Sequence, residues 1–168
     1  NEDGLPPGLE VDGHVATLRL RRPHRLNRLR AGDLRELQNL CARINGQIDI
    51  RAVVLTADTQ GQQRAVFSAG YDVSGFDDAG HDPRLFEQTV DAVAALRPIV
   101  IAGLNGSVYG GATDLVLACD LRIGLPGLAW RMPACALGLH YYPSGLQRYL
   151  TVLGPERARQ LFLTANTV

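Results

Sequence analysis

Short apolar runs typical of buried strands alternate along this chain with segments whose apolar residues recur at helical spacing. The runs 51–57 (RAVVLTA) and 99–104 (IVIAGL) contain β-branched residues, which favour buried strands. Apolar residues at helical spacing predict helices over 34–44 and 86–94, and the second helix is expected to end before Pro98. This alternation predicts a layered α/β domain.

Turn-forming residues and one alternating pattern add three further expectations. Asp12 and Gly13 lie between two strand-like runs, and this pair predicts a two-residue hairpin turn. Leucines alternate with arginines over 18–21, as in a half-buried strand. Near the end of the chain, Gly154 is expected to close one helix and Pro155 to begin the next.

Composition restricts the class of protein. The chain has 168 residues, enough for about one domain, and its formal net charge is zero. We therefore expect no nucleic-acid partner and no anionic membrane partner. Cys41, Cys119 and Cys135 lie in apolar surroundings, which predicts buried thiols of a reducing compartment. No apolar run has the length of a membrane span, and 1–10 lacks the pattern of a signal peptide, so we expect a cytoplasmic protein.

A glycine pair interrupts the stretch NGSVYGGATDLVLACD (105–120), between a strand and a helix expected from about Gly111 to Cys119. Helix N-termini expose unpaired N–H groups, and glycine lets a ligand oxygen approach them closely. The stretch does not support a phosphate loop, because the chain contains neither a lysine nor a glycine-rich phosphate motif. Taken alone, the pair fits equally well a strand and a helix that simply pack closely.

A second stretch, AVFSAGYDV (65–73), also follows a strand-like region and narrows to small residues. Two amides from two such turns, if they converge on one carbonyl oxygen, make an oxyanion hole. Four blocks of the chain, in this order, resemble those of the crotonase family (enoyl-CoA hydratase/isomerase): 15–29, 51–73, 97–123 and 132–165.

The resemblance implies a fold and an assembly. The fold is a crotonase-type spiral of β-β-α units, and members assemble as a homotrimer or a dimer of trimers. Residues 1–168 correspond to the N-terminal spiral domain. We expect the C-terminal helical trimerisation region to be missing from this chain.

The resemblance also implies a ligand, an acyl-CoA thioester. No tightly bound cofactor is implied, and coenzyme A is part of the substrate. The thioester carbonyl would accept hydrogen bonds from the backbone N–H groups of Tyr71 and Gly111. Four residues of the first two blocks are the implied coenzyme A contacts: His24, Arg25, Leu26 and Ala69.

The acid–base positions depart from the hydratase pattern, which uses two glutamates. Asp114 occupies the first position and is shorter by one methylene, whereas Ala134 occupies the second and has no acid. Addition of water needs a paired acid and base, and half of this pair is absent. A tyrosine at the position of Tyr141 is a feature in which the chain resembles the methylmalonyl-CoA decarboxylase branch of the family. Both predicted catalytic residues, Asp114 and Tyr141, also fit structural roles, as a helix-start carboxylate and a ring filler.

The predicted function is therefore that of an acyl-CoA enzyme of the hydratase/isomerase family, a lyase or isomerase of fatty acid metabolism that stabilises a thioester enolate. Two alternatives stay open: a malonyl-CoA-type decarboxylase and a coenzyme A-binding paralogue without turnover. We expect no metal, because His14, His24 and His81 show no ligand spacing.

Overall fold

The computed structural model describes residues 4–72 and 82–168 of the chain. The larger sheet has five strands in the order β1 (Leu5–Asp12), β2 (Val15–Arg21), β3 (Ala52–Ala57), β5 (Ile99–Leu104) and β7 (Leu121–Gly124). The smaller sheet has three strands in the order β4 (Val66–Ser68), β6 (Ser107–Tyr109) and β8 (Trp130–Arg131). Among the described residues, all strand pairs are parallel except β1 and β2.

The antiparallel pair β1 and β2 is the predicted hairpin, displaced by one residue. Asp12 pairs with Val15, so the two turn residues are Gly13 and His14. Gly13 has a φ of +55°, whereas His14 does not have a positive φ. A glycine with positive φ at the first turn position is typical of a type II′ hairpin, which places the turn one residue later than predicted.

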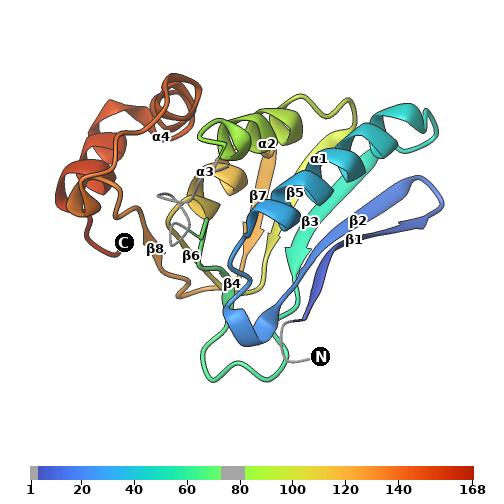
Figure 1. Ribbon diagram of the computed structural model, residues 1–168, viewed down its shortest axis with the longest axis horizontal. Coiled ribbons are helices and arrows are strands. Elements are labelled where there is room, and N and C mark those ends of the chain that lie inside the picture. Colours follow the sequence, from blue (N-terminus) through green and yellow to red (C-terminus); the bar gives the residue numbers. More distant parts are fainter. Residues whose placement is uncertain (1–3, 73–81) are drawn as a thin grey trace.

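The helices confirm the alternation of elements. They are α1 (Ala31–Gly46), α2 (Leu85–Ala94), α3 (Ala112–Leu117) and α4 (Pro143–Thr164), with short 3-10 segments η1 (Pro23–Arg25) and η3 (Cys135–Leu137). Figure 1 shows α1 and α2 packed together over one face of the larger sheet, and α4 beyond the smaller sheet. The predicted α/β class is correct.

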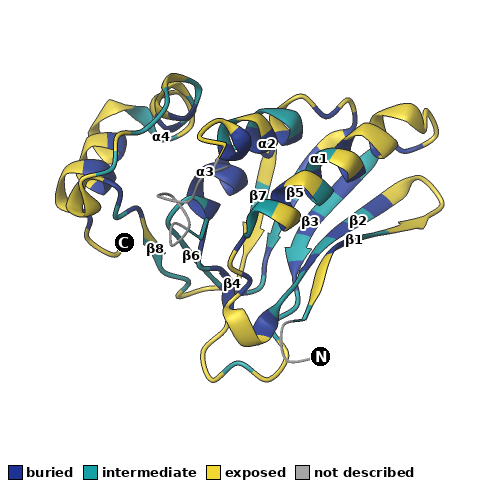
Figure 2. Cartoon of the chain, in the orientation of Figure 1, coloured by how far each residue is buried: buried dark blue, intermediate teal, exposed yellow. Residues whose placement is uncertain are grey.

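Two buried clusters form the interior (Figure 2). The first lies between the larger sheet and helices α1 and α2, and it includes alternate residues of β2 such as Leu18 and Leu20. The second lies under α4 and includes Met132, Tyr149 and Phe162. Helix α3 contributes to both clusters, Leu115 to the first and Leu117 to the second, and so connects them.

Helix α4 is bent at Gly154, where φ is +76° and ψ is 163°, and Pro155 begins the second half. This confirms the predicted helix end at Gly154. Cys41 and Cys119 are buried thiols, as predicted. Cys135 is exposed, because it lies in η3 at the surface, and the prediction of a buried thiol is wrong there.

Candidate active site

Two glycine bends lie against each other at one edge of the smaller sheet. Strands β4 and β6 are parallel neighbours, so the bends that follow them come together at the carboxyl ends of the strands. Gly70, in the first bend, has a φ of +89°. A Cβ atom at Gly70 would lie 2.7 Å from the carbonyl oxygen of Tyr109 and 2.8 Å from the amide nitrogen of Gly111. Only glycine therefore allows this approach of the two backbones.

Hydrogen bonds orient the backbone of the first bend. The Leu29 amide donates to the Gly70 carbonyl at 2.9 Å, and the Asp72 amide donates to the Leu29 carbonyl at 2.8 Å. These bonds form an isolated parallel bridge between Leu29 and Tyr71. In such a bridge the amide of Tyr71 itself points away from Leu29.

The second bend ends at the start of a helix. Gly111 precedes α3, and its carbonyl accepts a hydrogen bond from the Leu115 amide at 3.2 Å. Within residues 4–72 and 82–168, the amide of Gly111 has no hydrogen-bond acceptor. The N–H groups of a first helical turn have no partner in their own helix, so they are available to an anion or a polarised carbonyl.

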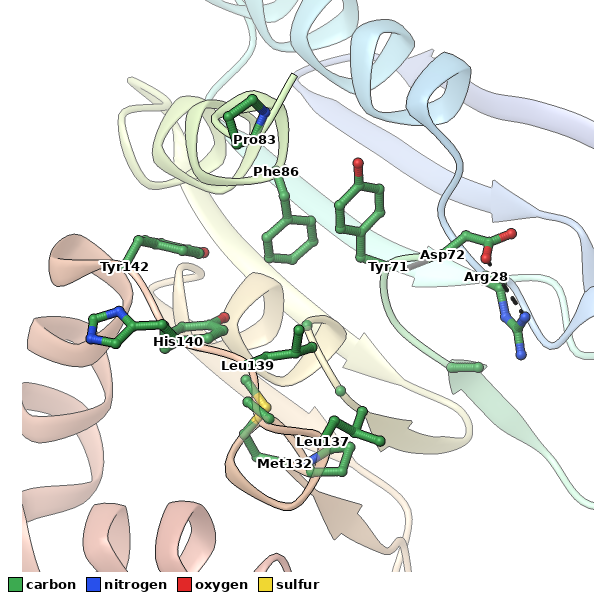
Figure 3. Close-up of a pocket in the computed structure, with 16 residues that line it drawn as sticks. Arg28, Tyr71, Asp72, Pro83, Phe86, Met132, Leu137, Leu139, His140 and Tyr142 are labelled. Atoms are coloured by element: carbon green, nitrogen blue, oxygen red, sulfur yellow. Dashed lines mark ion pairs between the residues drawn. The ribbon is translucent and has the colours of Figure 1, made fainter. Parts of the chain in front are cut away.

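A cavity of about 640 Å³ opens beside the two bends, and its size is that of a small-molecule site. Figure 3 shows its residues converging from three regions: the first bend, helix α2, and the segment between β8 and α4. The lining is mainly apolar and aromatic: Ala69, Tyr71, Pro83, Phe86, Gly110, Gly111, Met132, Pro133, Ala134, Leu137, Leu139, Tyr141 and Tyr142, with Arg28, Asp72 and His140 as its other polar side chains.

Asp114 lies behind this wall and not in the lining. It is fully buried in α3, and its carboxylate accepts hydrogen bonds from the hydroxyls of Tyr141, at 3.0 Å, and of Tyr142. Arg148 of α4 donates from Nε to Asp114 Oδ1 at 2.7 Å, and from Nη2 to Asp91 Oδ1 at 3.1 Å. The carboxylate therefore connects the cavity wall to α4 through an ion pair and two phenols.

A glycine of α4 makes room for this cluster. A Cβ atom at Gly145 would overlap the ring of Tyr141 and lie 2.8 Å both from Asp114 Oδ2 and from Cε2 of Tyr142. Helix α4 can approach α3 closely because Gly145 has no side chain. This approach brings Arg148, three residues further along the helix, to the carboxylate.

Burial keeps the phenols of this cluster protonated. Burial raises the pKa of Tyr141 well above its usual value, and the charges of neighbouring groups, including Asp114, raise it further. The pKa of Tyr142 is raised first by burial and then by the Asp114 charge. Both hydroxyls therefore act as hydrogen-bond donors to the carboxylate near neutral pH.

The predicted coenzyme A contacts lie beside the first bend. The Ala69 amide donates to the Leu26 carbonyl at 2.8 Å, and Ala69 lines the cavity. His24 and Arg25 are exposed residues of η1, next to Leu26. Arg28 lies at the cavity with its guanidinium 3.8 Å from Asp72 (Figure 3).

Sequence reasoning missed two residues of this region. Arg148 was one of 17 basic residues, all arginines, and nothing in its neighbourhood distinguishes it. Phe86 was predicted only as a residue of a helix face, although its ring lines the cavity. The one available signal for a partner of Asp114 is a general rule: a buried carboxylate requires a cation or hydrogen-bond donors beside it.

In the part of the chain that the structure describes, no group of three or more His, Cys, Asp or Glu side chains is arranged to hold a metal ion. None of the helices in residues 4–72 and 82–168 combines the length and apolar character needed to cross a bilayer.

The sequence matches the enoyl-CoA hydratase/isomerase family over residues 10–168. YngF of Bacillus subtilis is 33% identical over 160 residues, which cover 92% of this chain and 60% of that protein. The short-chain-enoyl-CoA hydratase of Clostridium acetobutylicum is 30% identical over 165 residues, covering 95% of this chain and 62% of that protein. The chain therefore spans about 60% of the length of these relatives.

Solved structures give the same result for the fold. The crystal structure of an enoyl-CoA hydratase from Bacillus anthracis superposes with a TM-score of 0.83 at 30% identity. The match covers 98% of this chain and 64% of that one. Together with the order of strands and helices, these comparisons confirm the fold and the resemblance expected from the four sequence blocks. The chain belongs to the enoyl-CoA hydratase/isomerase family, within the crotonase superfamily.

Proposed function

We propose that the cavity binds the thioester of an acyl-CoA, with the amides of Tyr71 and Gly111 donating hydrogen bonds to its carbonyl oxygen. The observation that carries this proposal is the contact of the two bends, in which a Cβ at Gly70 would lie 2.8 Å from the Gly111 nitrogen. The direction of the bridge at Leu29 and the position of Gly111 before α3 support it.

The chemistry follows from where negative charge develops. Loss of a substituent or proton from the α-carbon of a thioester leaves an enolate, whose charge is carried largely by the carbonyl oxygen. Two fixed N–H donors stabilise this charge without reorganising during the reaction, and in other enzymes one such donor contributes about 3–4 kcal/mol. The proposed class of reaction is accordingly that of a lyase or an isomerase.

We propose that Asp114 acts on the substrate through Tyr141. The Tyr141 oxygen accepts the α-proton while the Tyr141 hydroxyl proton passes to the Asp114 carboxylate, 3.0 Å away. Tyr141 is neutral before and after the step, the carboxylate becomes a carboxylic acid, and the electron pair of the C–H bond enters the enolate. The reverse transfer at another carbon returns the proton and completes an isomerisation. Tyr142 and Arg148 hold the carboxylate in place.

The coenzyme A moiety would lie along the first bend and η1. The proposed contacts are those named from the sequence: His24, Arg25, Leu26 and Ala69. The hydrogen bond from the Ala69 amide to the Leu26 carbonyl joins the two segments that carry these residues, which supports a shared binding surface. Arg28 is added as a candidate partner for a phosphate, because it lies at the cavity and is about half exposed.

A second candidate reaction is decarboxylation of a malonyl-CoA-type thioester. Ala134 lines the cavity and supplies a methyl group where hydratases have their second acid. Decarboxylation breaks the bond from the α-carbon to the carboxylate, releases CO₂ and leaves the same enolate, so it needs no base. A coenzyme A-binding role without turnover is the third possibility.

The assembly and setting of the whole protein are also proposals. We propose a homotrimer or a dimer of trimers, in the cytoplasm, acting in fatty acid metabolism, with coenzyme A entering only as part of the substrate. These proposals are carried over from the resemblance to the enoyl-CoA hydratase/isomerase family. Light scattering on the complete protein tests the assembly, and a monomer at micromolar concentration would contradict it.

The test of the site pairs two glycines with positive φ. Gly70→Ala would force the bends apart, whereas Gly127→Ala strains a glycine of φ +78° that has nothing within 4 Å of its Cβ position. Titration calorimetry with crotonyl-CoA is expected to show at least tenfold weaker binding for Gly70→Ala and unchanged binding for Gly127→Ala. Equal binding by both variants, or no binding by the unaltered protein, would overturn the proposal.

The reaction is assigned in a separate assay. The protein is incubated with crotonyl-CoA and with methylmalonyl-CoA, and the products are analysed by mass spectrometry and chromatography. Added water identifies hydration, loss of CO₂ identifies decarboxylation, and a shift in retention without a change in mass identifies isomerisation. Unchanged thioesters that nevertheless bind would identify a binding protein.

A further inference from the structure

Aromatic rings form a continuous row along the cavity. The ring of Tyr71 stacks on Phe86 with centroids 5.3 Å apart and an interplanar angle of 13°. Phe86 meets Tyr142 edge-on at 6.2 Å, and Tyr142 stacks on Tyr141 at 4.5 Å and 23°. All four rings line the cavity, and Figure 3 shows Phe86 between Tyr71 and Tyr142.

The row is fixed at the end formed by Tyr141 and Tyr142. Their hydroxyls both donate to Asp114, which is fully buried and paired with Arg148. Rotation of either ring away from the wall would break a hydrogen bond to a buried charge. The cluster therefore holds the two rings in the wall of the cavity.

The row also lies beside the place proposed for the thioester carbonyl. A Cβ atom at Gly111 would lie 2.5 Å from Cζ of Phe86, so this ring lies directly against the second bend. Tyr71 belongs to the first bend and stacks on the same ring. The part of an acyl group that is next to the carbonyl would thus meet Phe86 and Tyr71 first.

We infer that this cavity selects a flat, conjugated acyl group, of the aryl-thioester class, over a saturated one of equal size. The inference rests on the proposed thioester site. Ring-on-ring contacts add to affinity beyond the apolar area they bury, and their offset-stacked and edge-to-face geometries need a planar partner. The other walls, from Met132 to Leu139, supply apolar contact that does not distinguish planar from puckered groups.

The test compares benzoyl-CoA with cyclohexanecarbonyl-CoA, which share a carbon skeleton and differ in planarity. Calorimetric titration of the complete protein is expected to give at least about fivefold tighter binding of benzoyl-CoA, a factor that corresponds to about 1 kcal/mol. Phe86→Leu is expected to reduce this preference to twofold or less. Leu163→Ala, an exposed change on α4 away from the cavity, is expected to keep it.

The outcomes separate the inference from the function on which it rests. Equal affinity for the two thioesters would overturn the inference while leaving the thioester site in place. Equally tight binding of free coenzyme A and benzoyl-CoA would also overturn the inference, because the acyl group would then add nothing to the affinity. Absence of binding by both thioesters and by crotonyl-CoA would overturn the proposed function, and the inference with it. If Phe86→Leu does not fold, the comparison in the unaltered protein still decides.

Discussion

Replacing Arg148 with methionine is expected to destabilise the folded chain by about 3 kcal/mol. Asp114 is fully buried, and the Arg148 side chain is only 14% exposed. Removing one partner of a buried ion pair costs about 3–5 kcal/mol, because the other charge stays buried without its counterion. The hydroxyls of Tyr141 and Tyr142 still donate to the carboxylate, so the loss is expected at the lower end of this range.

Urea unfolding followed by circular dichroism measures this loss. A slope of about 2 kcal/mol per molar urea converts it to a midpoint lower by about 1.5 M. Asp91→Asn is the matched control, since it removes the other carboxylate bound to Arg148. Asp91 is 44% exposed, so this change is expected to cost less than about 1 kcal/mol.

A double-mutant cycle isolates the pair. In a background that carries Asp114→Asn, Arg148→Met is expected to cost about 1 kcal/mol or less, because no buried charge is left behind. If Arg148→Met costs the same with and without the carboxylate, the ion pair does not stabilise the fold and the reasoning is refuted. A cost below that of Asp91→Asn would refute it as well.

Three further predictions concern Gly145 and the cysteines. Gly145→Ala should lower the free energy of unfolding by roughly 1–3 kcal/mol, because the new methyl group overpacks the contact of α4 with α3. The control is Gly32→Ala, at a helical site where a Cβ atom meets nothing within 4 Å; it should raise the free energy of unfolding by up to about 1 kcal/mol in urea titrations. Equal effects would contradict the close approach of α4. At pH 8 a thiol reagent should label Cys135 in the folded chain and all three cysteines after unfolding. The reason is that burial raises the pKa of Cys41 to about 11 and that of Cys119 to about 12. Labelling of Cys41 as fast as Cys135 in the folded chain would refute this. Because these pKa values are raised only in the folded chain, the unfolded thiols ionise first, from about pH 9. The free energy of unfolding should therefore fall as pH rises from 9 towards 12. A urea midpoint that holds steady or rises over that interval would be inconsistent with buried neutral thiols.

Much of the fold was predictable from local sequence patterns. The strand at 99–104, the helix that ends before Pro98 and the break at Gly154 all occur as expected, and each depends on residues within about ten positions. The hairpin was displaced by one residue, because the backbone angle of Gly13 decides the turn type. Cys135 is exposed because its apolar neighbours form a short surface turn, which composition does not reveal.

The amino-acid sequence by itself determined the α/β class, the two glycine bends and the family, since all three are recorded in residue type and short-range spacing. Only the tertiary structure decided which of 17 basic side chains pairs with Asp114 and that the carboxylate lies behind the cavity wall. The physical reason is that Tyr141, Tyr142 and Arg148 follow Asp114 by 27, 28 and 34 residues along the chain. Contacts over such separations depend on how α3 and α4 pack, and packing is a property of the folded chain as a whole.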